Sequence, residues 1–105
     1  MIRPIIHLLL HFIVPGMVAK LSFGDRWKRA WLIMALAIIV DLDHLLANPI
    51  FDPNRCSIGY HPLHLYPAIL IYLALTIIPK TRLIGLGLLI HMALDAVDCI
   101  WMMAL

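Results

Sequence analysis

The chain has 105 residues, of which 64% are hydrophobic and 13% are charged, with a net charge of +2 and a mean hydropathy of +0.98. A soluble domain of this length cannot bury so much apolar surface, because small domains bury the smallest fraction of their chain, and the excess is expected to face lipid. The basic residues are scattered without interleaved aromatic residues, which argues against a nucleic-acid partner.

The first apolar segment, residues 5–23, has the length of about 17–25 residues that a helix needs to cross a bilayer. It carries His7 and His11, which are four residues apart and therefore share one helical face. A cleaved signal peptide is the competing interpretation. Two histidines inside the apolar stretch and the lack of a small-residue cleavage motif favour a membrane helix instead.

The second apolar segment, residues 27–47, ends on the polar sequence VDLDH. Asp41 and His44 are three residues apart and share a helical face, whereas Asp43 points elsewhere. Asp43 is therefore a candidate for two roles, a general base or a group that orients a ligand histidine. Three such groups at the end of a lipid-facing helix are costly to remove from water, so they require a compensating partner.

The third apolar segment, residues 62–78, follows a loop over residues 48–60 that is marked by Asn-Pro and Gly. His61 and His64 open the segment with a spacing of three residues, so both would lie on the same side of a helix that begins here.

The fourth apolar segment, residues 83–105, contains His91, Asp95 and Asp98 at positions i, i+4 and i+7. This spacing puts three ionisable groups on one stripe of a helix. A polar stripe within a membrane helix is expected to face the interior of the bundle, and it favours a functional site over a structural role.

The basic residues are distributed unequally between the two ends of the predicted helices. One side holds Lys20, Arg26, Lys28, Arg29, Lys80 and Arg82. The other side holds Arg3 and Arg55, so the positive-inside rule places both termini and the 48–60 loop outside the cytoplasm. Cys56 and Cys99 would both lie on this oxidising side, where a disulfide and two separate thiols are both open interpretations.

All six histidines and four of the six acidic residues fall at similar depth in the outer half of the membrane. The sequence therefore predicts a single all-α domain, residues 1–105, folded as a four-transmembrane-helix bundle with a polar metal site in its outer half. Each charged aspartate at the bilayer centre costs roughly 2.5–3.5 kcal/mol. Two divalent cations would balance four carboxylates, those of Asp41, Asp43, Asp95 and Asp98. Imidazole and carboxylate donors suit zinc first, and manganese or iron also.

The motifs HLLLH, DLDH, HPLH and HMALD, in this order on four helices, resemble the membrane-bound metal-dependent hydrolase family of bacteria. The whole chain, including ANPIFDPNRCSIGYHPLH, also resembles a family of small bacterial membrane proteins with no assigned function. The resemblance implies as metal ligands His11, Asp41, His44, His61, His64, His91 and Asp95. The hydrolase family is similar in its helix-borne ligands to zinc-dependent phospholipase C. The chain departs from it where HPLHLYP replaces the usual HRGxTHS.

The expected function is hydrolysis of a lipid-like ester or phosphoester from the outer leaflet by water activated at the metal. Asp43 or Asp98 would act as general base, His7 would complete the ligand set, and Arg55 and Tyr60 would bind an anionic headgroup. The alternative is a metal-ion or proton transporter that uses the same His and Asp cluster, and a haem-binding bundle ranks third. A homodimer is left open, because the sequence contains no strong interface motif.

Overall fold

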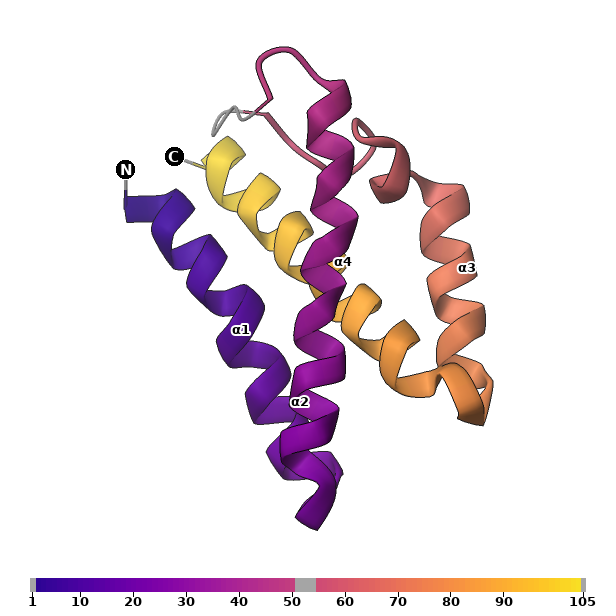
Figure 1. Cartoon of the computed structure of the whole chain (residues 1–105). Coiled ribbons are helices and arrows are strands. Elements are labelled where there is room, and N and C mark those ends of the chain that lie inside the picture. Colours follow the sequence, from indigo (N-terminus) through magenta and orange to yellow (C-terminus); the bar gives the residue numbers. More distant parts are fainter. Residues whose placement is uncertain (1, 51–54, 105) are drawn as a thin grey trace.

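The computed structural model describes residues 2–50 and 55–104, which are mostly helical and contain no strand, so the all-α prediction is confirmed. The elements are α1 (Ile2–Ser22), η1 (Gly24–Arg26), α2 (Trp27–Ala35), η2 (Leu36–Leu46), η3 (Pro62–His64), α3 (Tyr66–Ile77), η4 (Pro79–Thr81) and α4 (Arg82–Ala104). Both chain termini lie at the same end of the molecule as the connection that follows η2 (Figure 1). The predicted end of the fourth segment at Leu105 lies outside the described residues.

Two helical stretches, Ile2–Ser22 and Pro79–Met103, are long and apolar enough to cross a membrane by length and composition. The other two predicted spans are divided. Residues 27–46 are shared between α2 and η2, and α3 begins only at Tyr66. The interruptions have local causes in the backbone, which also set the directions of the polar side chains.

The second predicted helix tightens halfway along. Figure 1 shows α2 and η2 as one continuous rod, but η2 is wound as a 3₁₀-helix, in which side chains three residues apart are eclipsed. Asp41 and His44 therefore stand on the same side of the rod, with His44 Nδ1 3.8 Å from Asp41 Oδ1. Asp43 points in another direction, as predicted, and is buried.

The third predicted helix is broken at Leu65, which is extended (φ −82°, ψ 159°). Pro67 lies in the first turn of α3 and has no N–H to donate to the carbonyl of Leu63. The buried Tyr72 hydroxyl donates a 2.7 Å hydrogen bond to that carbonyl instead. The break lets His61 and His64 leave the helical register and turn into the molecule, where both are buried.

Helix α4 packs against α1, α2 and α3, and two glycines allow the close approach. A Cβ on Gly85 would meet the backbone of Thr76 in α3. A Cβ on Gly87 would lie 2.7 Å from Cα and 2.8 Å from the carbonyl oxygen of Met34 in α2. Both obstacles are backbone atoms, which cannot rotate away, so residues with side chains are excluded at these positions without helix displacement.

We expect Gly87→Ala to lower the free energy of unfolding by about 1–3 kcal/mol, the usual cost of overpacking a close contact. The measurement is the thermal unfolding midpoint in detergent, with Ala93→Val as the control because Ala93 is exposed on the same helix. Equal midpoints for Gly87→Ala and the wild type would contradict the close packing of α4 on α2.

A disulfide joins Cys56 to Cys99, with their Cα atoms 5.1 Å apart, and resolves the alternative that the sequence left open. It ties the segment that begins at Arg55 to the C-terminal part of α4, one residue beyond Asp98. The segment that carries Arg55 is thereby held beside the acidic stripe of α4.

The helices leave most of their apolar surface outside. In residues 2–50 and 55–103, eight hydrophobic residues are buried, whereas thirty large hydrophobic side chains are exposed. Monomeric soluble proteins rarely expose contiguous apolar patches larger than a few hundred Å². The interior is instead rich in ionisable groups, namely His11, Asp43, His61, His64, His91 and Asp95, all with exposed fractions of 5% or less.

Candidate metal centre

Four donor atoms from three parts of the chain converge in the interior, and we call their residues the central set: Asp41, His64, His91 and Asp95. The Nε2 atom of His64 lies 2.9 Å from Asp95 Oδ2, 3.3 Å from Asp41 Oδ1 and 3.3 Å from His91 Nε2. The Nε2 atom of His91 lies 3.0 Å from Asp41 Oδ1 and 3.3 Å from Asp95 Oδ2. One oxygen or nitrogen of every residue thus faces the same point.

The separations of these donors fit the coordination sphere of a small cation. Donors about 2.0–2.2 Å from a tetrahedral zinc ion lie about 3.3–3.6 Å from one another. The five measured distances of 2.9–3.3 Å approach this value from below, so small outward shifts would admit an ion. The central set could therefore hold a metal ion.

The hydrogen bonds of His64 make these donors suitable for a cation. Its Nδ1 lies 2.9 Å from Asp43 Oδ2, an acceptor, so in the neutral imidazole Nδ1 carries the hydrogen and Nε2 carries the lone pair. That lone pair faces the carboxylates of Asp41 and Asp95. Asp95 Oδ2 has no partner with hydrogen-bond geometry in the described chain although two imidazole nitrogens are within 3.3 Å. Buried acceptors that face one another are stabilised by a positive ion between them.

A second group, the lateral set, uses the other oxygen of the same carboxylate. Asp95 Oδ1 lies 2.9 Å from His7 Nε2 and 3.3 Å from His11 Nε2. His11 Nδ1 donates to the carbonyl of His7 at 2.8 Å, which again leaves Nε2 as an acceptor. Among the described residues, the buried His11 Nε2 also has no partner with hydrogen-bond geometry. Asp95 therefore stands between two donor sets, with one oxygen turned to each.

The outer set contains Asp43, His44 and His61, which also bring donor atoms within 4.8 Å of one another. The rings of His44 and His61 are stacked, with centroids 3.8 Å apart and planes at 26°. Lone pairs lie in the ring planes, so stacked imidazoles direct them side by side rather than toward one point. Burial lowers the pKa of the His61 imidazole, and the neighbouring His44 lowers it further, which favours neutral His61.

From this position Asp43 orients His64, a member of the central set. Its Oδ2 accepts hydrogen bonds from His64 Nδ1 and from the backbone N–H of Leu63, both at 2.9 Å, and Oδ1 lies 3.2 Å from His44 Nδ1. The carboxylate is buried and both of its oxygens are occupied. This arrangement matches the carboxylate–histidine–metal pattern, in which the carboxylate fixes the tautomer of a ligand histidine.

A cavity of about 470 Å³ opens beside the central and lateral sets, and we call it the outer cavity. Its lining includes the donors His7, Asp41, His44 and Asp95, together with Arg3, Arg55, Ser57 and Asp98. The side chain of Asp41 is 33% exposed, whereas those of His64, His91 and Asp95 are exposed by 3% or less. The donor groups are thus buried on the inner side and accessible from this cavity.

Two arginines lie at the wall of the outer cavity. Arg3 Nη1 donates to both oxygens of Asp98 at 2.9 Å, and His7 Nδ1 is 4.0 Å from Asp98 Oδ1. Arg55 donates to the carbonyls of Pro49 and Ile50 at 2.9 and 3.0 Å. Its buried Nε has no hydrogen-bond partner in the described residues.

Tyr60, predicted to contact the substrate, is 54% exposed and is not among the residues that line the outer cavity. Its ring lies 4.9 Å from the guanidinium carbon of Arg55, a cation–π contact, and its centroid lies 5.1 Å from that of the His61 ring.

Sequence reasoning missed the partner of Asp98 and the contribution of Ser57 to the cavity. The sequence did contain an indication that Asp98 would form an ion pair. Arg3 and Arg55 are the two arginines on the side where the acidic groups gather, so an ion pair with one of them was to be expected. The pairing of Arg3 with Asp98 joins residues 95 positions apart, which no local pattern reveals.

Comparison with known proteins gives one match. Residues 1–103 match a family described as "Family of unknown function (DUF6122)". No curated protein and no solved structure matches the chain.

Proposed function

The chain belongs to this family of unknown function, so its activity has to be argued from its own residues, and we propose that it is a membrane-embedded, metal-dependent hydrolase of an anionic lipid-like ester or phosphoester. The observation that carries the proposal is Asp95, whose two oxygens face two separate groups of imidazoles beside a cavity lined by arginines. The resemblance of HLLLH, DLDH, HPLH and HMALD to membrane-bound metal-dependent hydrolases agrees with it.

We place all four predicted segments across the bacterial inner membrane, with both termini outside the cytoplasm. The exposed apolar side chains of every helix support this placement, because lipid is the solvent that they match. The Cys56–Cys99 disulfide supports the orientation, since disulfides persist on the oxidising side of the membrane. On this orientation the outer cavity opens toward the outer leaflet, and membrane lipid supplies the substrate.

The proposed centre binds two divalent ions that share Asp95. The central set offers four donors, as in closed tetrahedral sites, and the lateral set offers three, as in sites that keep one position for water or substrate. Zinc fits these nitrogen and oxygen donors best, and manganese and iron are compatible with them. In this arrangement His44 and His61 support the ligands of the central set.

Replacing Asp43 by Asn is expected to weaken metal binding about 10–100-fold, the usual effect of removing a carboxylate that orients a ligand histidine. Asn can still accept a hydrogen bond from Leu63 N but no longer holds the proton on His64 Nδ1 with a full charge. Competition with a chelator of known affinity measures the change. Unchanged affinity would mean that Asp43 has no part in the centre.

In the proposed hydrolysis, the side chains around the outer cavity have separate roles. Arg55, at the wall of the outer cavity, would place its guanidinium beside the anionic group of the substrate, and the imidazoles of His7 and His11 would hold the ion of the lateral set. When bound there, a divalent ion would supply a bound water of lowered pKa and polarisation of the ester oxygen. Asp98, at the cavity wall, accepts the proton that the attacking water loses and returns it to the departing alkoxide.

The test is turnover by the purified protein in mixed micelles. After loading with zinc, manganese or iron(II), the protein is given a phosphomonoester (dilauroyl phosphatidic acid) and a phosphodiester (dilauroyl phosphatidylglycerol), two anionic lipids that also carry carboxyl esters. We expect metal-dependent release of phosphate, alcohol or fatty acid from at least one of them. Metal binding without turnover of any of these substrates would contradict the proposed hydrolase activity but not the proposed metal centre.

A proton relay is the second candidate, because the six imidazoles form a continuous series. Successive ring centroids, in the order His44, His61, His64, His91, His11 and His7, are 3.8, 5.7, 5.4, 4.4 and 4.3 Å apart. At the end of the molecule that carries Arg26, Arg29 and Lys80, however, the interior is the apolar cluster of Ala19, Ala30 and Met34, which does not continue the series. Proton movement in vesicles that are loaded with a pH-sensitive dye would favour this function over hydrolysis.

A further inference from the structure

A larger cavity, of about 830 Å³, lies between α2–η2 and the start of α4, and we call it the basic groove. Its volume is within the range of about 300–1,000 Å³ that small-molecule sites occupy. The groove shares no lining residue with the outer cavity. It is thus a separate feature of the described chain, and the proposed hydrolase does not use it.

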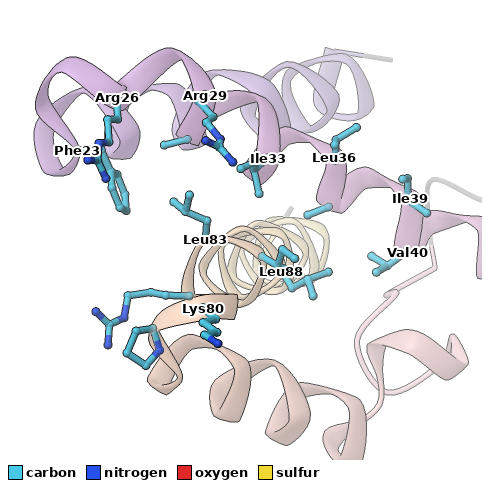
Figure 2. A pocket seen from close by; sticks show the side chains of 15 residues that line it. Phe23, Arg26, Arg29, Ile33, Leu36, Ile39, Val40, Lys80, Leu83 and Leu88 are labelled. Carbon is cyan, nitrogen blue, oxygen red and sulfur yellow. The ribbon is translucent and has the colours of Figure 1, made fainter.

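The lining of the basic groove is divided into a charged end and an apolar length. Arg26, Arg29, Lys80 and Arg82 form the charged end, and none of the described residues that line the groove is acidic. Figure 2 shows Arg26 and Arg29 along the wall formed by η1 and α2, with Lys80 across the cavity from them. Asp25, in the same turn as Arg26, is exposed and does not line the groove.

Beyond these cations, the two facing walls of the groove are lined by hydrophobic side chains. Ile33, Leu36 and Val40 come from α2 and η2, and Leu83 and Leu88 come from α4 (Figure 2). These side chains offer the walls that a hydrocarbon chain needs.

Within residues 2–50 and 55–104, the side chains of three of the four cations have no ion-pair or hydrogen-bond partner. In the part of the chain that the structure describes, Arg26, Arg29 and Lys80 make no ion pair, and Arg82 donates to the carbonyls of Thr76 and Ile77 at the end of α3. Several like charges around one opening repel one another unless an anion lies between them.

From this charge complementarity we infer that the basic groove binds an anionic phospholipid of the cytoplasmic leaflet, with its phosphate among the four cations and one acyl chain along the apolar walls. Basic pockets between membrane helices are suited to such headgroups, because each Lys or Arg near an anionic surface strengthens binding about fivefold. The inference needs the membrane placement proposed above but no catalytic activity, and the two can fail separately.

The test is native mass spectrometry of the full chain released from zwitterionic detergent with added dioleoylphosphatidylglycerol or dioleoylphosphatidylcholine. We expect selective retention of phosphatidylglycerol by the wild type, and about 30-fold weaker retention by Arg26→Gln/Arg29→Gln, since two cations are lost. The matched control is Lys20→Gln/Lys28→Gln, which removes two basic residues of the same side that contact Trp27 and do not line the groove.

The outcomes separate the lipid from other occupants. Equal retention of the two lipids, or equal losses in both double variants, would overturn the inference, as would displacement of the lipid by millimolar inorganic phosphate. A dimer that excludes lipid would assign the groove to a second copy of the chain. Equal unfolding midpoints of wild type and variants in phosphatidylcholine nanodiscs establish that a loss of binding reflects the groove and not misfolding.

Discussion

Asp95→Asn is expected to reduce bound metal from about two equivalents per chain to nearly none. The substitution keeps the size of the side chain but replaces the charged carboxylate that faces the imidazoles of both the central and the lateral sets. With both of its oxygens engaged, Asp95 is the residue whose loss weakens two ions together. Elemental analysis of the detergent-purified variant, reconstituted in parallel with the wild type, measures the effect.

Two further variants show whether the loss has this cause. His11→Gln removes a donor of the lateral set alone and should leave about one equivalent, while Asp25→Asn, at an exposed turn of η1, should leave both. One equivalent retained by Asp95→Asn would show that the two sets do not share this carboxylate, and two would remove Asp95 from the centre.

Asp98→Asn is expected to lower turnover of the substrate about 10²–10⁴-fold, the contribution of a general base, with bound metal unchanged. Asp98 belongs to neither the central nor the lateral set, and it lines the outer cavity where substrate would enter. Asn can still accept a hydrogen bond from Arg3, so the wall of the cavity should keep its form. Steady-state rates and metal content are measured on the same preparation.

The pH dependence of the rate separates this role from a structural one. Loss of a general base removes the acidic limb of the rate profile, whereas a packing defect would lower the rate by the same factor at every pH. Full activity in Asp98→Asn would mean that another group accepts the proton, and it would contradict the role proposed for Asp98.

The helical periods of the sequence anticipated much of the centre. His7 and His11, and likewise His91 and Asp95, are four residues apart, and each pair brings its donors to one place. This part was predictable because spacing along one helix determines which side chains share a face. The polar interior also followed from composition, since lipid-facing positions cannot carry so many ionisable groups.

The relations between helices were not predictable in this way. The division of the donors into sets depends on how far apart the helices pack, and the close approach at Gly87 is a property of two helices together. The extended Leu65 redirects His64 toward Asp43, although Pro67 in the sequence indicated that the helix could not run through unchanged. No proline or capping residue in the sequence indicates that η2 is wound as a 3₁₀-helix.

The most direct test of the metal centre is the metal content of the wild-type protein itself, purified without chelators and then reconstituted with zinc, manganese or iron(II) in turn. Elemental analysis should give about two tightly held equivalents of one of these metals per chain after gel filtration. No retained metal under any of the three conditions would contradict the centre, and the buried histidines and aspartates would then have to be a hydrogen-bonded proton network.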